Sequence, residues 1–226
     1  MRFDLRNVTT FWINLDRATG NAKAMTEQFG SLGFQDTRRI SGRVIPPPNL
    51  PSIRLKAFGT HFVGCGQSHL DALTLSTTSK TTLPFLVLED DAISTSAFNP
   101  IIDIPEGTDA VYLGVSHGNK NQAIIDLNNG WYRIVGMLTT HAILYTSKRF
   151  VDAAMTSIKE SIYKKQIPLD SGYGMLQGSY NVIAPQSPMF IQGNSRESIN
   201  KWESLTNKPL KPTHVFANGA IQEIKP

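Results

Sequence analysis

The stretch PFLVLEDDAI (residues 84–93) passes directly from four apolar residues into three carboxylates. The apolar run, residues 85–88, has the length and composition of a buried strand. Glu89, Asp90 and Asp91 follow where that strand ends, and like charges at adjacent positions repel one another. The stretch therefore predicts a strand at the centre of the fold, ending in a cluster of negative charge that needs a partner.

Outside this stretch, strands and helices are expected to alternate along the chain. Apolar residues at helical spacing predict the helices, and short β-rich runs predict the strands. This alternation predicts an α/β sandwich around a largely parallel sheet, in which ligands bind beyond the carboxyl ends of the strands. The expected strands are residues 10–15, 85–89, 109–115, two within 131–147, 180–185 and 188–192, and the expected helices are residues 16–34, 64–80 and 147–163.

Composition is that of an ordinary globular protein. With 226 residues, 40% of them apolar and 18% charged, we expect one domain over residues 1–226, whose polar tail (193–226) could pack over the site. The net charge of +4 suits an anionic ligand but does not by itself indicate nucleic acid. A single cysteine, a charged amino terminus and the lack of a long apolar run predict a cytoplasmic protein without a disulfide, signal peptide or membrane span. The sequence makes no prediction of oligomeric state.

The carboxylates after residue 88 fit a metal–diphosphate site. Mg²⁺ and Mn²⁺ prefer carboxylate oxygens and often bridge to a substrate phosphate. Because side chains alternate along a strand, Glu89 and Asp91 would share one face, and Asp90 would point to the other or bond to backbone amides. The alternative is a carboxylate-capped turn, with Asp91 as the cap. Spacing alone leaves both interpretations open.

Six segments, taken together and in order, resemble glycosyltransferase family 25, which comprises lipopolysaccharide-type transferases related to procollagen galactosyltransferases. The FLVLEDDA segment is similar to the family's L-I-L-E-D-D-V core. The chain departs from the pattern at Gly64-Cys65-Gly66, at Leu73 near a tryptophan position and at Thr139 in place of glycine. The six segments are FWINLDRATGNAKAMTEQF (11–29), VGCGQSHLDAL (63–73), FLVLEDDA (85–92), TTHAILYTSKRFVDAAM (139–155), IPLDSGYGM (167–175) and PQSPMFIQGNSRESI (185–199).

This resemblance implies a GT-A (Rossmann-like) fold, a three-layer α/β/α sandwich with a mostly parallel central sheet. It also implies a glycosyltransferase that moves a hexose from a nucleotide sugar, usually a UDP-sugar, to a glycan acceptor, with Mn²⁺ or Mg²⁺ across the diphosphate. Glu89 and Asp91 become the D-x-D-type pair that holds the metal. The other expected donor-binding residues are Asn14, Leu15, Asp16, Arg17, Asp90, Gln192 and Ser195, although Arg17 could equally be a solvated first-turn residue.

A direct, inverting displacement needs a base for the acceptor hydroxyl, and Asp170 is the candidate. It follows a proline and matches the family's P-x-D element, while the alternative is a helix N-cap. His141 could line the acceptor side or be structural. His214 could close over the site as a third metal ligand, against the alternative of a surface histidine in the tail. His69 is expected to be a core histidine with one hydrogen bond, whose tautomer could orient a site carboxylate.

Two other functions remain open from the sequence. One is glycosylation of a modified DNA base, because a basic stretch within residues 38–56 could track a phosphate backbone. Few aromatic residues interleave with that stretch, so a solvated basic loop is favoured over a nucleic-acid groove. The other is a catalytically silent module that binds a glycan or a partner, although such a module has no need for clustered carboxylates without a metal. The basic residues are Arg38, Arg39, Arg43, Arg54 and Lys56.

Overall fold

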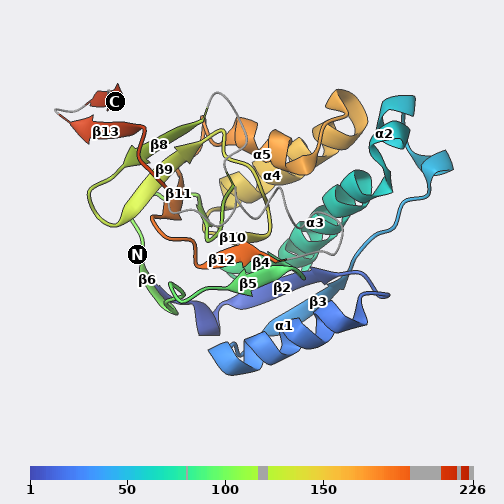
Figure 1. Cartoon of the computed structure of the whole chain (residues 1–226), viewed down its shortest axis with the longest axis horizontal. Helices are drawn as coiled ribbons and strands as arrows, with labels where there is room; N and C mark the ends of the chain where they lie inside the picture. Colours follow the sequence, from blue (N-terminus) through green and yellow to red (C-terminus); the bar gives the residue numbers. More distant parts are fainter. Residues whose placement is uncertain (80, 117–121, 194–209, 218–219, 224–226) are drawn as a thin grey trace.

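A central ten-stranded sheet organises the protein, with helices packed on both of its faces (Figure 1). The structure is a computed structural model that describes residues 1–79, 81–116, 122–193, 210–217 and 220–223. In spatial order the strands are β14 (Ala220–Glu223), β13 (His214–Ala217), β8 (Ala123–Asp126), β9 (Trp131–Val135), β11 (Val182–Pro185), β7 (Ala110–Tyr112), β10 (Ala142–Tyr145), β4 (Phe85–Glu89), β2 (Thr9–Asn14) and β3 (Thr37–Ser41).

The sheet is mixed, so the expectation of a mostly parallel sheet is wrong. Strand β2 runs parallel to β3 and β4, and the pairs β7–β11 and β8–β13 are also parallel. The other five pairings among the described strands are antiparallel. The difference arises because β10 returns between β4 and β7 and because β8 and β9 form a hairpin, closed by a turn in which Asn128 and Gly130 have positive φ.

Alternating side chains along β4 fill two hydrophobic layers. Phe85 and Val87 belong to the cluster that also contains residues of α3, α4 and α5, while Leu86 and Leu88 face the cluster that contains residues of α1. This alternation follows from the two-residue period of a strand and produces three layers, as Figure 1 shows. The helices are α1 (Thr19–Leu32), α2 (Ile53–Phe58), α3 (Thr60–Thr78), α4 (Lys148–Glu160) and α5 (Leu169–Leu176), with a π-helical segment at Ser161–Lys165 and 3-10 turns at Leu5–Asn7 and Pro47–Asn49.

Helix boundaries follow signals that the sequence carries. Helix α1 ends at Gly33, whose positive φ of 79° suits the left-handed cap that glycine favours. Helix α4 begins after Ser147, whose side chain accepts a hydrogen bond from the Phe150 amide, as an N-cap does. The expected helices at 16–34 and 147–163 are therefore confirmed, with shifted ends.

Two small sheets extend the core at its rim. Strand β1 (Arg2–Asp4) pairs with β6 (Ile101–Asp103), and β5 (Ala92–Ser94) pairs with β12 (Phe190–Gln192). The β5–β12 pair brings the chain around residue 192 back to the acidic stretch after β4. Because β13 and β14 extend the far edge of the main sheet, the described part of the tail does not cover that stretch. Within the described parts of the chain, no helix combines the length and apolarity needed to cross a bilayer.

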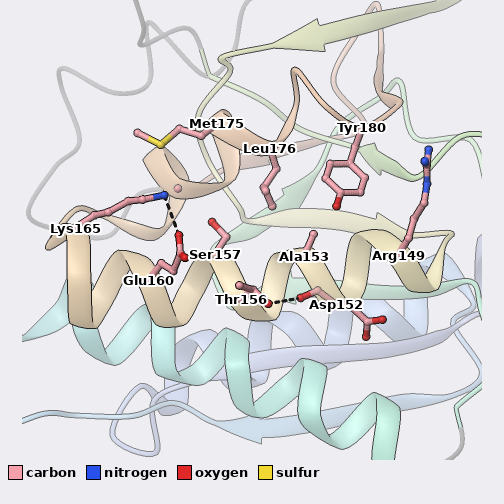
Figure 2. A pocket seen from close by; sticks show the side chains of 11 residues that line it. Arg149, Asp152, Ala153, Thr156, Ser157, Glu160, Lys165, Met175, Leu176 and Tyr180 are labelled. Carbon is pink, nitrogen blue, oxygen red and sulfur yellow. Dashed lines mark hydrogen bonds and ion pairs between the residues drawn. The ribbon is translucent and has the colours of Figure 1, made fainter.

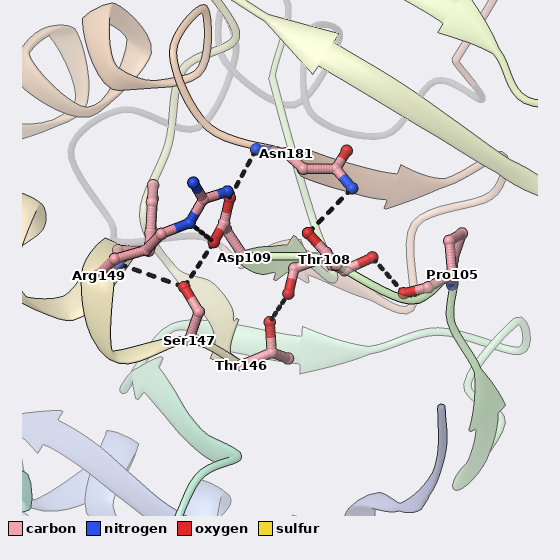
Figure 3. Close-up of polar contacts among 9 residues, drawn as sticks. Pro105, Thr108, Asp109, Thr146, Ser147, Arg149 and Asn181 are labelled. Atoms are coloured by element: carbon pink, nitrogen blue, oxygen red, sulfur yellow. Dashed lines mark hydrogen bonds and ion pairs between the residues drawn. The ribbon is translucent and has the colours of Figure 1, made fainter.

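Asp109 holds several segments together at the amino end of β7 (Figure 3). Its carboxylate accepts hydrogen bonds from the Arg149 Nε at 2.6 Å, the Ser147 hydroxyl at 2.6 Å and the Asn181 amide at 2.8 Å. A second guanidinium nitrogen of Arg149 also contacts it. Asp109 therefore ties the start of α4 and the loop before β11 to β7, at the edge of the sheet opposite the acidic cluster.

Candidate active site

The acidic cluster lies at the edge where β2 and β4 end and β10 begins. Glu89 closes β4 and points to the α3 side, where His69 Nε2 lies 3.0 Å from its Oε1. The Thr140 hydroxyl donates to the same oxygen at 2.7 Å. The Glu89 amide donates to the backbone carbonyl of His141 at 2.9 Å, which fixes the end of the strand. Glu89 is thus held from a helix and from the neighbouring strand at once.

Asp90 and Asp91 diverge from Glu89 after the strand ends. The Asn14 side-chain amide donates to Asp90 Oδ2 at 2.6 Å, so Asp90 turns toward the end of β2. The Gln192 side-chain amide donates to Asp91 Oδ2 at 3.1 Å, while Asp91 Oδ1 is buried and has no hydrogen-bond partner among the described residues. The partners named here are an imidazole, a hydroxyl and two amides, none of which carries a permanent positive charge.

Burial and mutual repulsion shift the pKa values of these groups. Burial, followed by the charge of Glu89, raises the pKa of Asp91 to about 8. Burial also raises the pKa of Asp90, against the opposing hydrogen bonds of Asn14 and Asn21. Burial acts on Glu89 in the same direction, but the hydrogen bond and charge of His69 outweigh it, so the pKa of Glu89 is lowered overall.

The donor set of the cluster fits a hard divalent cation. Carboxylate oxygens are the ligands that Mg²⁺ and Mn²⁺ prefer. The unpartnered, buried Oδ1 of Asp91 is an acceptor that the protein leaves open, and the raised pKa shows that a negative charge there lacks compensation. A cation beside Asp91 would supply both the missing partner and the missing charge.

Asp170 lies in the first turn of α5 and is not the N-cap, because Pro168 occupies that position. Its Oδ1 accepts a hydrogen bond from the Ser171 amide at 2.6 Å. Burial raises the pKa of Asp170, and the charge of Glu89 adds to the shift. The charge of Glu89 thus acts on Asp170, although 81 residues of sequence separate the two.

Asn14, the last residue of β2, reaches the cluster, whereas Asp16 and Arg17 after it lie at the surface. Asn14 is buried and connects β3 to the acidic cluster. Its side-chain oxygen accepts a hydrogen bond from Arg39 Nε at 3.0 Å, and its side-chain amide donates one to Asp90. Asp16 pairs with Arg39 at 2.6 Å and with the Ser41 hydroxyl at 2.8 Å. Arg17 is exposed. Leu15 is partly buried, and its backbone approaches closely to Gly42, where a Cβ would lie 3.1 Å from the Leu15 nitrogen.

Two expected site residues, His214 and His141, do not lie where the sequence predicted them. His214 lies on β13, six strand positions from β4 and therefore roughly 25–30 Å away, where it contacts the Thr213 hydroxyl. The expectation of His214 as a third metal ligand is wrong, because the tail pairs with β8 at the far edge of the sheet. His141 is only 1% exposed, with Nε2 3.3 Å from the Phe190 carbonyl, so it cannot line an acceptor surface. Ser195 lies outside the described residues.

Sequence reasoning missed Thr140 and understated His69. His69 is fully buried with one hydrogen bond, as expected of a core histidine, and that bond is made to Glu89. The signal for this contact was the acid at the end of β4. Thr140 carried no signal, because its role depends on β10 running antiparallel beside β4.

The basic stretch is largely neutralised by neighbouring acids. Arg38 pairs with Asp36 at 2.8 Å, and Arg43 pairs with Asp71 at 2.5 Å. Arg39 is engaged by Asp16, as described above. Guanidinium groups held in this way are poorly placed to track a phosphate backbone, which weakens the nucleic-acid alternative.

A separate hollow of about 510 Å³ lies between α4 and α5 (Figure 2). Its walls combine the stems of α4 side chains with Met175 and Tyr180, and Lys165 pairs with Glu160 at its rim. No residue of the acidic cluster and no other expected site residue lines it. The hollow therefore contributes nothing to the chemistry at the end of β4.

In comparisons with known proteins, no protein family and no curated protein matches this sequence. One solved structure similar to this chain is the crystal structure of a glycosyltransferase involved in the glycosylation of the major capsid of PBCV-1. It is 10% identical in sequence, and the match covers 79% of this chain and 93% of that chain with a TM-score of 0.37. At this identity and TM-score the likeness establishes neither a fold family nor an activity, and the chemistry of the site has to stand by itself.

Proposed function

We propose that the protein is a metal-dependent, inverting glycosyltransferase that moves a hexose from a nucleotide sugar, most simply a UDP-sugar, to a glycan acceptor. The observation that carries the proposal is Asp91: a buried carboxylate with one open oxygen, beside Glu89, at the carboxyl edge of β2 and β4. Carboxylates in this state are suited to a cation that also binds a diphosphate. The sequence resemblance to family 25 points to the same chemistry.

In this proposal, one group of residues binds the metal and the donor, and Asp170 acts as the base. Asp91 and Glu89 would hold Mn²⁺ or Mg²⁺, which neutralises charge on the departing diphosphate when bound. Gln192 fixes one oxygen of Asp91, and His69 and Thr140 fix one oxygen of Glu89, so the remaining oxygens keep a defined direction. These contacts set the geometry of the carboxylates before any ligand arrives.

Asn14 and Asp90 are the donor-side pair. Their hydrogen bond at 2.6 Å joins the ends of β2 and β4, where the base and ribose of the nucleotide are expected. Asn14 is in turn oriented by Arg39. Asp16 and Arg39 are paired at the surface beside it, so their two charges offset one another.

Asp170 is the proposed base. As the acceptor oxygen bonds to the anomeric carbon, the bond from that carbon to the diphosphate oxygen breaks, and the acceptor proton passes to the Asp170 carboxylate. Burial and the nearby Glu89 raise the pKa of Asp170, which makes it a stronger base than an exposed aspartate. The Ser171 amide holds one of its oxygens in place.

A thermal-shift panel tests this proposal. UDP-, GDP-, CMP- and dTDP-sugars are added with and without Mn²⁺ to the wild type, to Asp91→Asn and to the control Asp152→Asn, whose side chain is exposed on α4. A donor at a hundredfold over its Kd adds about 2.7 kcal/mol, which corresponds to roughly 5–10 °C for a chain of this length.

The expected result is a shift with one nucleotide class that requires Mn²⁺, disappears in Asp91→Asn and persists in Asp152→Asn. A shift that does not need a metal would overturn the metal dependence. No shift with any nucleotide would overturn glycosyl transfer and leave a binding module that has kept the architecture.

A further inference from the structure

Cys65 lies one helical turn before His69 on the face of α3 that looks toward the end of β4. Residues four apart lie on the same side of a helix, so the thiol and the imidazole are neighbours. The His69 Nε2 contacts Glu89 Oε1 at 3.0 Å. The Cys65 sulfur, a His69 ring nitrogen and a Glu89 carboxylate oxygen all lie within 4.8 Å of one another. Helix α3 and strand β4 thus bring three different metal-ligating groups close together.

We infer that Cys65, His69 and Glu89 form a binding site for a thiophilic divalent cation of the Zn²⁺ or Cd²⁺ type. Thiolate, imidazole and carboxylate are the three ligand types that proteins use for zinc. The thiolate distinguishes this set from the all-oxygen environment that Mg²⁺ and Mn²⁺ prefer. The inference does not depend on glycosyl transfer, although the site shares Glu89 with the cation proposed for that reaction.

The separation of the three atoms fits a tetrahedral site after a small adjustment. Zinc bonds of about 2.0–2.3 Å place ligand atoms about 3.3–3.6 Å apart. The present spread of up to 4.8 Å is about 1 Å wider than this, so binding would draw the three side chains closer together. Three protein ligands leave the fourth position to solvent.

The tautomer of His69 is not fixed by a second hydrogen bond among the described residues. The side chain is fully buried, and its Nδ1 has no hydrogen-bond partner among the described residues. The tautomer that carries its proton on Nδ1 therefore leaves the Nε2 lone pair free for a metal. Binding forms a metal–sulfur bond and releases the Cys65 thiol proton, so one proton leaves for each cation bound.

The test is a titration of Cd²⁺ into the full-length protein, followed by the thiolate-to-cadmium charge-transfer absorption in the ultraviolet. We expect one Cd²⁺ per chain, a band that Zn²⁺ abolishes by competition, and no band in Cys65→Ser or Cys65→Ala. His69→Gln should weaken binding by about tenfold or more, since even outer contacts of a metal site contribute that much. The control His61→Gln, an exposed histidine on the same helix, should bind like the wild type.

Asp91→Asn separates this site from the proposed donor site, because it should lose the Mn²⁺-dependent nucleotide shift and keep the Cd²⁺ band. A band that is insensitive to His69→Gln would reduce the site to a single reactive thiol and overturn the inference. Co²⁺ provides a check that needs no variant. Four-coordinate Co²⁺ with a sulfur ligand absorbs strongly in the visible, and the weak spectrum of an octahedral, water-like ion in the wild type would equally overturn it.

Discussion

Two aspartates with buried carboxylate oxygens lie at opposite edges of the same sheet and have opposite surroundings. Asp109, at the amino end of β7, receives hydrogen bonds from Arg149, Ser147 and Asn181 (Figure 3). Burial alone would raise the pKa of Asp109, but these partners outweigh it and leave the pKa lowered. Asp91, after β4, has one amide partner and one open oxygen, and burial with the charge of Glu89 raises its pKa to about 8.

The two carboxylates therefore differ in their effect on stability. Ionised Asp109 stabilises the fold, whereas ionised Asp91 opposes it. A buried charge with a full set of donors costs little, whereas a buried charge without them opposes folding. Proteins keep such unfavourable groups mainly at functional sites, where a ligand supplies what is missing. Asp109 therefore stabilises the architecture, whereas the open oxygen of Asp91 is available to the cation that we propose.

The largest expected effect is a loss of catalytic rate, from a substitution at the edge of the sheet that carries the acidic cluster. Asp170→Asn should lower kcat about 10²–10⁴-fold, because the amide cannot accept the acceptor proton. In the wild type, kcat should rise with pH through a pKa above the usual aspartate value of about 3.9, since the pKa of Asp170 is raised. Release of nucleoside diphosphate measures the rate, and donor binding in the thermal-shift panel should be unchanged. An unaltered pH profile in Asp170→Asn would remove Asp170 as the base.

Substitutions at the opposite edge, around Asp109, should lower the stability of the protein and leave its activity unchanged. Asp109→Ala is expected to lower the free energy of unfolding by about 2–4 kcal/mol, because the Ser147 hydroxyl and Asn181 amide lose a buried acceptor. Arg149→Ala should cost less than Asp109→Ala, since the Arg149 side chain is 64% exposed and its charge is screened by solvent. Urea denaturation measures both. Equal losses in the two variants would show that the ion pair, and not the buried hydrogen bonds, stabilises this edge.

The pH dependence of stability should differ in sign between the two aspartates. Asp91 has a folded-state pKa of about 8 against about 3.9 when unfolded, so the folded protein holds the extra proton between these values and loses stability as pH rises through them. Asp109, with a lowered pKa, contributes stability above its unfolded pKa that is lost as the solution becomes more acidic. Between pH 5 and pH 8, Asp91→Asn should therefore gain about 3–4 kcal/mol relative to the wild type.

Denaturation curves at several pH values measure this difference. Saturating Mn²⁺ should flatten the wild-type slope, because a cation removes the penalty on the ionised carboxylate. Asp152→Asn should follow the wild type at every pH. A constant difference between Asp91→Asn and the wild type would mean that Asp91 is ionised throughout, and that the acidic edge is better compensated than its contacts indicate.

Strand and helix positions were predictable where the chain gives local signals. The apolar run before Glu89 is β4, and Ser147 caps α4 as its spacing predicts. The mixed order of the sheet was not predictable in the same way, because the direction of β10 depends on long-range pairing with β4 and β7. A short apolar run has the same composition whether its neighbours run parallel or antiparallel to it.

The same distinction between local signals and long-range contacts holds for the candidate site. The acidic triplet could be found from adjacent charges, and Asn14 from its place at the end of a neighbouring strand. The contacts of Glu89 with His69 and Thr140 join segments 20 and 51 residues away, which no local pattern encodes. His214 failed as a ligand for a related reason: nothing in the sequence shows that the tail adds strands at the far edge of the sheet.

The smallest expected effect compares a serine at each edge. The Ser147 hydroxyl donates to Asp109 at 2.6 Å and accepts from the Phe150 amide at 3.3 Å, so Ser147→Ala should cost about 1 kcal/mol as the loss of an N-cap. The Ser171 hydroxyl lies 3.4 Å from Asp170, a weak contact, and Ser171→Ala should change stability by less than about 0.5 kcal/mol. Because Ser147 and Asp109 share one network, their double variant should lose less than the sum of the two single losses, which urea denaturation of all three can measure. Strict additivity would mean that the N-cap and the Asp109 network act independently, and a loss in Ser171→Ala as large as in Ser147→Ala would remove the contrast between the two edges.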